Sequence, residues 1–183
     1  IMNLYSAHGH SDFLIACGYK GEMIKEYFHK FIVHNSDYVI DFRTGEVDWV
    51  NRHRLDWRVA VVDTGVETMT GGRILRLRSL IEGPTFMVTY GDGVGNVDIT
   101  ALVAFHQAHG KLATVTAVRP PSRFGGLVLG GDAVREFSEK PQTDEGWING
   151  GFFVFERSVF DYLRDETTIL EREPLERLVA DGQ

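Results

Sequence analysis

Residues 85–93 read TFMVTYGDG, and this stretch decides how the rest of the chain is interpreted. Thr85 to Thr89 is a short run bounded by turn residues, which predicts a buried β-strand. The glycines on either side of Asp92 allow a sharp turn and a close approach to a ligand. Open α/β sheets bind ligands beyond the carboxyl ends of their strands, so Asp92 is a candidate ligand for Mg²⁺, which prefers oxygen donors. An ordinary Asp-Gly turn is the alternative, since such dipeptides are common in loops.

Strand and helix patterns alternate along the whole chain. The predicted strands are 12–17, 57–62, 85–89, 111–118, 127–129, 134–138 and 152–155, with a hairpin made of 37–42 and 46–50. The predicted helices are 2–8, 22–31, 97–109, 157–163 and 173–180, with a further helix that places Ile74, Leu77, Leu80 and Ile81 on one face. This alternation predicts a single α/β domain over residues 1–183, with a Rossmann-like, mixed but mainly parallel sheet and helices on both faces.

Composition limits the classes of function. The 183 residues are 43% hydrophobic and 25% charged, which suits a globular domain with a sizeable core and without a membrane-spanning run. A net charge of −7 argues against a non-specific nucleic-acid binder, which requires a basic surface. It does not argue against a single nucleotide held by a few local cations. The one cysteine, Cys17, excludes an internal disulfide and lies in an apolar run typical of a buried thiol.

Polar side chains occur in three predicted loops beyond strands. Arg73, at the end of the 68–73 segment, and Lys140 carry charges that would neutralise phosphates. Glu139 and Asn149 offer acceptors and donors for sugar hydroxyls. The free backbone amides expected where the 68–73 loop enters a helix would also receive phosphates. The alternatives are a solvent-facing arginine, a surface ion pair at Glu139-Lys140 and a simple turn at 149–151.

Other phosphate and metal motifs are absent from the sequence. It contains neither the P-loop pattern nor a Gly-x-Gly-x-x-Gly after a strand. His8 with His10, and His106 with His109, lack the further ligands that a zinc site needs. We expect these histidines to face solvent or to cap helices.

Sequence blocks spread along the chain resemble the sugar nucleotidyltransferases, in particular members that use CTP and glucose 1-phosphate. The blocks are FLIACGYKG (13–21), IKEYF (24–28), VVDTG (61–65), MTGGR (69–73), TYGDGV (89–94), FHQAHGK (105–111), RFG (123–125), EKP (139–141) and INGGFFV (148–154). The order and spacing of MTGGR, TYGDGV and INGGFF are specific, whereas EKP and GDG are shared with pyrophosphorylases of other base or sugar preference.

The resemblance implies the nucleotide-diphospho-sugar transferase fold and transfer of a cytidylyl group from CTP to α-D-glucose 1-phosphate, with Mg²⁺. It implies a cytoplasmic homo-oligomer, without nucleic-acid or membrane partners, that makes a precursor of the deoxysugars of surface polysaccharide. Asp92, as metal ligand, and Lys140 would be catalytic. The residues implied to bind the nucleotide are Thr68, Gly72, Arg73 and Gly91. Those implied to bind the sugar phosphate are Gly125, Glu139, Lys140, Asn149 and Gly151.

Alternatives to this interpretation are a pyrophosphorylase of the same fold that uses UTP or dTTP, and a non-catalytic nucleotide-sugar binding module. The chain also differs from the family at its ends. Relatives begin with a strand and a Gly-rich loop that carries an Arg, followed by a Lys, and they continue into a segment with a second metal-binding Asp. We therefore expect these 183 residues to be part of a longer polypeptide, and to bind nucleotide poorly and not turn over by themselves.

Overall fold

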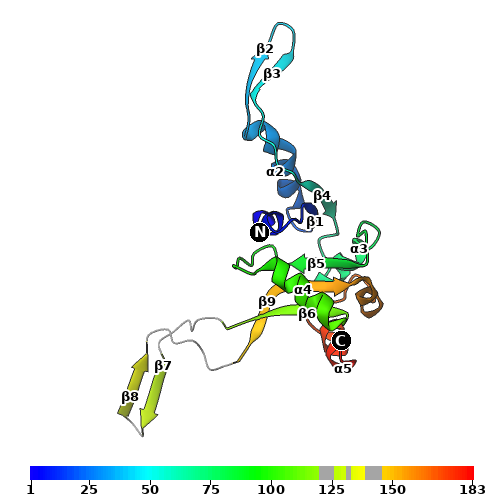
Figure 1. Ribbon diagram of the computed structural model, residues 1–183. Coiled ribbons are helices and arrows are strands. Elements are labelled where there is room, and N and C mark those ends of the chain that lie inside the picture. Colours follow the sequence, from blue (N-terminus) through cyan, green and yellow to red (C-terminus); the bar gives the residue numbers. More distant parts are fainter. Residues whose placement is uncertain (120–125, 131–132, 139–145) are drawn as a thin grey trace. The chain divides into compact units, whose positions relative to one another are not determined.

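The computed structural model describes residues 1–119, 126–130, 133–138 and 146–183 (Figure 1). The chain divides into two compact units, one made of residues 1–84 and 157–183 and the other of residues 85–156. Each unit combines helices with strands, so the predicted mixed α/β class is confirmed. The sheet was expected to be mainly parallel, but of the five strand pairings in the described residues one is parallel and four are antiparallel. That residues 1–183 form one domain stays a prediction. No helix in the described part of the chain is long and apolar enough to cross a membrane.

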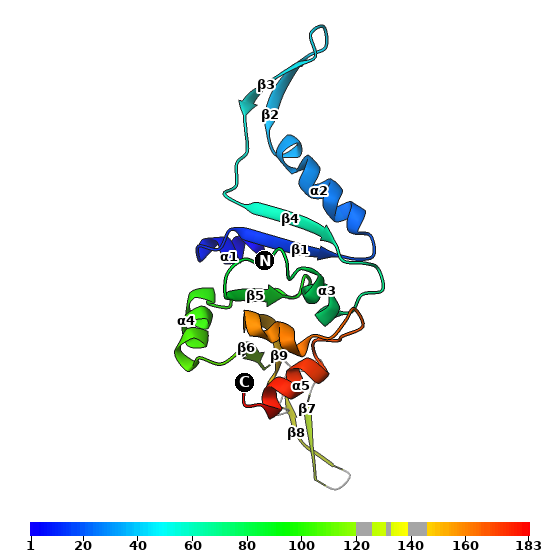
Figure 2. The same cartoon turned by 90° about the vertical axis from the view of Figure 1, so that its right-hand side faces the viewer.

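The first unit contains the parallel pair of strands β1 (Asp12–Cys17) and β4 (Arg58–Asp63). Parallel strands need a long connection, and here it consists of α2 (Gly21–His34) and a hairpin of β2 (Asp37–Asp41) and β3 (Glu46–Asn51). Figure 2 shows α2 leading from the end of β1 towards this hairpin. The short helix α1 (Met2–Ala7) precedes β1.

The beginning of α3 (Thr70–Arg76) packs against the chain near residue 166, backbone to backbone. The amides of Met69 and Gly72 donate hydrogen bonds to the carbonyls of Glu166 (2.9 Å) and Thr168 (3.1 Å). A Cβ atom at Gly72 would lie 2.4 Å from the Glu166 carbonyl oxygen. This close approach therefore requires glycine. The same unit ends with the 3₁₀-helix η1 (Arg157–Tyr162) and with α5 (Glu173–Ala180).

The helix predicted from the apolar residues between 74 and 81 is shorter than expected. α3 ends at Arg76, and Leu80, which we expected on its buried face, is 45% exposed. The amides of Arg78 and Leu80 bond three residues back, to Leu75 and Leu77, as in a 3₁₀ turn. The 3.6-residue period therefore stops, and Leu80 turns to solvent. The helix predicted over 157–163 is present as a 3₁₀-helix over residues 157–162.

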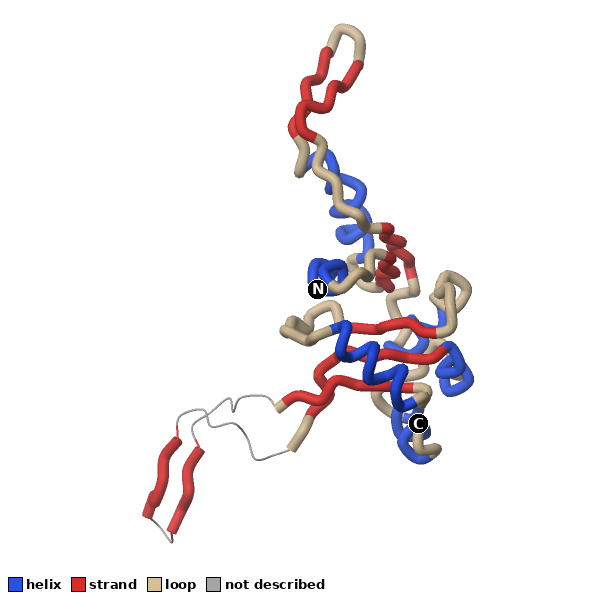
Figure 3. The backbone as a smooth tube through the Cα atoms, viewed as in Figure 1, coloured by secondary structure: helices blue, strands red, loops and turns tan. Residues whose placement is uncertain are grey.

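The second unit is organised around β9 (Ile148–Glu156), the central strand of an antiparallel sheet with the order β5–β9–β6. Its neighbours are β5 (Thr85–Thr89) and β6 (Ala113–Val118), and α4 (Ile99–His109) packs against β6 and β9 (Figure 3). Four successive residues of β9, Phe152 to Phe155, are at most 2% exposed, which explains the continuous apolar run. Two further strands, β7 (Gly126–Gly130) and β8 (Ala133–Ser138), form a separate antiparallel pair.

A buried polar cluster holds α4 on this sheet. His106 is 1% exposed, and its Nδ1 lies 2.8 Å from the hydroxyl of Thr114. Its Nε2 lies 3.1 Å from Glu156 Oε1, which also accepts a hydrogen bond from Thr85 (2.8 Å). The Thr114 hydroxyl also lies 2.6 Å from Nε2 of His109. The expectation of solvent-facing or capping histidines is wrong for His106, whose burial is possible because both ring nitrogens are hydrogen-bonded.

The direction of these hydrogen bonds follows from the amide of Lys111. It donates to His109 Nδ1 (3.0 Å), so a neutral His109 carries its proton on Nε2 and donates it to Thr114. The Thr114 hydroxyl then donates to His106 Nδ1, and His106 Nε2–H donates to Glu156. Each donor meets an acceptor while both rings are neutral.

Replacing Gly72 with alanine should lower the free energy of unfolding by about 1–3 kcal/mol, because the added methyl group overlaps the Glu166 backbone. Gly91→Ala is the matched control, since a Cβ atom there meets no described atom within 4 Å. Urea denaturation followed by circular dichroism measures both variants. Equal stability of the two variants would show that the 69–72 segment does not pack closely on residue 166.

Replacing His106 with leucine should lower the free energy of unfolding by about 2–4 kcal/mol, because Thr114 and Glu156 lose a buried partner. His29→Leu, at an exposed position of α2, is the control and should change it by less than about 0.5 kcal/mol. Thermal and urea unfolding measure both. A loss below about 1 kcal/mol for His106→Leu would contradict the buried cluster.

Candidate functional site

Asp92 lies in an exposed turn directly beyond β5, where the sequence placed it. Among the residues that the structure describes, none forms a hydrogen bond or an ion pair with its carboxylate. The neighbouring Gly91 is exposed as well. The carboxylate is therefore available to a cation, and its oxygens are of the type that Mg²⁺ prefers.

The 149–151 segment lies inside β9, as a bulge next to this turn, and not before the strand as predicted. Val115 pairs with Phe153 and Ala117 pairs with Asn149, so two residue steps on β6 correspond to four on β9. The extra length is taken up where Gly151 adopts a φ of +77°, which favours glycine. A bulge bends its strand and changes the direction of nearby side chains, and such bulges are frequent beside active sites.

Tyr90 joins the bulge to the turn. Its amide donates to the Gly151 carbonyl (3.2 Å), and its hydroxyl accepts a hydrogen bond from Asn149 Nδ2 (3.1 Å). Its ring covers the Gly151 backbone, where a Cβ atom would lie 2.6 Å from Tyr90 Cδ2. The structure thus brings two predicted sugar-phosphate residues, Asn149 and Gly151, to the residue that leads into the Asp92 turn. Tyr90 itself was not predicted, although an aromatic residue directly before Gly-Asp-Gly was a visible signal.

Arg73, in the first unit, is held by neutral oxygens. Its Nη1 donates to the Cys17 carbonyl (3.1 Å) and to the Thr64 hydroxyl (2.7 Å), and its Nη2 donates to the Val66 carbonyl (3.3 Å). These contacts fix the side chain without neutralising its charge. The guanidinium therefore remains able to attract an anion such as a phosphate.

The residues that hold Arg73 come from the ends of the parallel strands. Thr64 follows β4, is fully buried and donates its hydroxyl proton to the Cys17 carbonyl (2.8 Å). Gly18 follows β1, and a Cβ atom there would lie 2.4 Å from Arg73 Nη2. Cys17 is a core residue, as predicted, and burial raises the pKa of its thiol. Gly18 and Thr64 lie in the blocks FLIACGYKG and VVDTG, but neither residue was predicted to have a role at the site.

The backbone at the start of α3 differs from the expectation. The amides of Met69 and Gly72 are not free, because carbonyls of residues 166 and 168 accept their hydrogen bonds. Thr68, predicted to bind the nucleotide, is only 7% exposed. These two amides are therefore not available to a phosphate, and the phosphate-binding role of Arg73 stays a prediction. The nucleotide-binding roles of Thr68 and Gly72 stay predictions.

Three predicted site residues, Gly125, Glu139 and Lys140, lie outside the described residues, so their roles stay predictions. Within the described residues, no group of three or more His, Cys, Asp or Glu side chains is arranged to hold a metal ion. Mg²⁺ is usually bound by one or two carboxylates, with substrate phosphates and water as the other ligands. The single carboxylate of Asp92 fits a site of this kind.

Comparison with known proteins agrees with the resemblance seen in the sequence. The nucleotidyl transferase family model matches residues 70–178. The glucose-1-phosphate cytidylyltransferase of Salmonella typhimurium is 46% identical over 184 residues, which cover 100% of this chain and 72% of the relative. A probable glucose-1-phosphate cytidylyltransferase of Bacillus subtilis is 42% identical with the same coverage.

A solved structure supports the fold independently. HddC from Yersinia pseudotuberculosis superposes with a TM-score of 0.64 over 96% of this chain and 69% of its own, and at 17% identity it shows the fold alone. The Rossmann-like fold predicted from the sequence is thereby confirmed. The family model spans more than half of the chain and a 46%-identical relative aligns with all of it, so the chain belongs to the nucleotidyl transferase family.

Proposed function

We propose that this protein transfers CMP from CTP to α-D-glucose 1-phosphate, giving CDP-glucose and pyrophosphate. The observation that carries the proposal is the 46% identity, along the whole chain, to the glucose-1-phosphate cytidylyltransferase of Salmonella typhimurium. The family resemblance extends the proposal to a cytoplasmic homo-oligomer whose product is a precursor for deoxysugars of surface polysaccharide.

The reaction needs positioned phosphates more than a reactive side chain. A phosphate oxygen of glucose 1-phosphate attacks the α-phosphorus of CTP, and the bond from that phosphorus to the oxygen bridging to the β-phosphorus breaks, releasing pyrophosphate. Such transfers depend on alignment and on neutralisation of charge. The protein therefore needs to supply cationic and hydrogen-bonding groups around the reacting phosphorus, and it needs no nucleophilic side chain.

On the nucleotide side, Arg73 is the group that the geometry supports best. Its guanidinium is fixed by three neutral oxygens and keeps its charge, so it would bind a phosphate of CTP without first breaking an ion pair. Thr68, Gly72 and Gly91 are assigned to the nucleotide by motif. Gly91 has room for a close ligand, since a Cβ atom there meets no described atom within 4 Å.

On the sugar-phosphate side, Asn149 and Gly151 would bind glucose 1-phosphate beside the Asp92 turn. Asn149 is exposed and keeps one N–H and one lone pair beyond its two hydrogen bonds. Gly125, Glu139 and Lys140 complete this side by motif, with Lys140 holding the attacking phosphate. Asp92 would hold Mg²⁺, which when bound neutralises charge on the phosphates.

A panel of nucleoside triphosphates tests the base assignment in the full-length protein. With glucose 1-phosphate and Mg²⁺, CTP should give a kcat/KM at least about tenfold above UTP, dTTP and GTP, since hydrogen bonds to a base discriminate by this factor or more. Pyrophosphate release, followed by a coupled assay, measures each rate. UTP or dTTP at the level of CTP would favour the alternative pyrophosphorylases. Absence of release with every triphosphate would favour a binding module.

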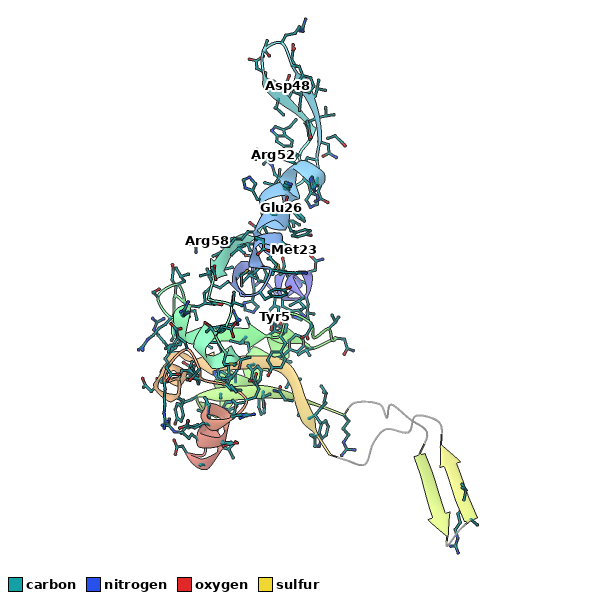
Figure 4. All side chains as sticks on the ribbon, turned by 180° about the vertical axis from the view of Figure 1, so that it is seen from behind. Tyr5, Met23, Glu26, Asp48, Arg52 and Arg58 are labelled. Atoms are coloured by element: carbon teal, nitrogen blue, oxygen red, sulfur yellow. The ribbon has the colours of Figure 1, made fainter. Side chains whose placement is uncertain are left out.

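Replacing Asp92 with asparagine should lower kcat/KM by about 100-fold or more, because a metal ligand contributes several kcal/mol to stabilisation of the transition state. The affinity for Mg²⁺–CTP, measured by calorimetry, should fall as well. Asp48→Asn is the matched control, since Asp48 is an exposed aspartate of β3 (Figure 4) and should leave both quantities unchanged. A fall of only a few-fold for Asp92→Asn would exclude Asp92 as the metal ligand.

A further inference from the structure

We infer that Tyr90 is a positioning residue for glucose 1-phosphate, because its hydroxyl fixes the carboxamide of Asn149 and its ring fixes the bulge at Gly150-Gly151. This inference rests on the proposed function, in which Asn149 binds the sugar phosphate. It adds a residue to which neither the sequence nor the family resemblance gave a role.

The hydrogen bonds around Asn149 determine the orientation of its side-chain amide. Oδ1 accepts from the Gly151 amide (2.8 Å), and Nδ2 donates to the Tyr90 hydroxyl (3.1 Å). A flipped carboxamide would place the NH₂ group of Asn149 against the N–H of Gly151, donor facing donor. The second hydrogen on Nδ2 and the second lone pair on Oδ1 consequently point in fixed directions. The N–H would donate to a hydroxyl or phosphate oxygen of a ligand, and the lone pair would accept from a ligand hydroxyl.

The ring of Tyr90 confines the bulge from one side. Gly151, with its φ of +77°, lies so close that a Cβ atom would be 2.6 Å from Tyr90 Cδ2. Phe153 supports the ring, with centroids 5.8 Å apart and planes at 70°. Strand β6 confines the neighbouring glycine, since a Cβ atom at Gly150 would lie 2.9 Å from the Thr116 carbonyl oxygen. The two glycines therefore have little freedom to move.

The same residue also starts the Asp92 turn. The Gly151 carbonyl accepts hydrogen bonds from the Tyr90 amide (3.2 Å) and from the Thr89 hydroxyl (3.0 Å), which attaches the end of β5 to the bulge. Asp92 follows Tyr90 by two residues. Tyr90 thus sets the position of Asn149 relative to the carboxylate, and in the proposed reaction it would align the attacking phosphate with the metal-bound one.

Tyr90→Phe removes only the hydroxyl and keeps the ring on Gly151, so it tests the bond to Asn149. In the full-length protein, the KM for glucose 1-phosphate should rise about three- to tenfold, the usual effect of one lost hydrogen bond. The KM for CTP and kcat should stay within about twofold, because the ring and the turn are retained. A purely structural role would not separate the two substrates in this way.

A double-mutant cycle with Asn149→Ala shows whether Tyr90 acts through Asn149. The double variant Tyr90→Phe/Asn149→Ala should have the same KM for glucose 1-phosphate as the single variant Asn149→Ala, because the Tyr90 hydroxyl has no amide to orient once Asn149 is removed. Tyr162→Phe is the matched control: it removes a tyrosine hydroxyl that donates to Asp181 (2.8 Å) in the other unit, and it should leave both KM values unchanged.

Two outcomes would overturn the inference. One is an unchanged KM for glucose 1-phosphate in Tyr90→Phe, and the other is an effect that adds fully to that of Asn149→Ala. Inactivity of the wild type with CTP and glucose 1-phosphate would instead count against the proposed function. In that case, calorimetry measures the coupling of Tyr90 to Asn149 without turnover, from the binding of glucose 1-phosphate to the wild type, the two single variants and the double variant.

Discussion

The contact between the ring of Tyr90 and the backbone of Gly151 is the constraint on which the second unit depends. The ring leaves no room for a side chain at residue 151, and β6 leaves none at residue 150. Glycine at both positions makes the bulge possible, and the bulge makes the register of β6 and β9 shift between Val115 and Ala117. Beyond the bulge, residues 152–155 form the buried centre of the sheet. One aromatic residue thus links the hydrophobic core to the polar end of the strand.

The first unit depends instead on a charged side chain, Arg73, that is held by uncharged groups. Two parallel strands end side by side, and a carbonyl and a hydroxyl from their ends point at the same guanidinium. A carboxylate in that place would have fixed Arg73 equally well but would have cancelled its charge. Neutral oxygens orient the side chain and leave its positive charge uncancelled, which suits the role proposed for Arg73 in binding a phosphate.

Local sequence signals predicted most of the elements. The bounds of β1, β5 and α5 agree with the predicted ranges, and α4 has the signals expected of a helix: Asp98 caps its first turn and Gly110 ends it with a φ of 64°. The errors occur where contacts between residues distant in the sequence determine the local structure. The spacing of apolar residues alone did not predict that α3 ends at Arg76 or that β9 extends back through a glycine bulge. It also did not predict that His106 is buried between Thr114 and Glu156. Among the candidate residues, Asp92 and Arg73 could be proposed from sequence as a metal ligand and a phosphate-binding group, whereas the contacts of Tyr90, Gly18 and Thr64 involve partners that sequence spacing does not show.

The hydrogen-bonded histidines also limit how the chain can change length. Four residues, 110–113, separate His109 from Thr114, whose hydroxyl must reach both imidazoles. Neighbouring residues of a strand point to opposite faces, so an insertion or deletion of one residue here would present Ala113 or Val115 to the rings in place of a hydroxyl. The connection between α4 and β6 is therefore a loop of fixed length, although it lies on the surface, where loops usually vary freely.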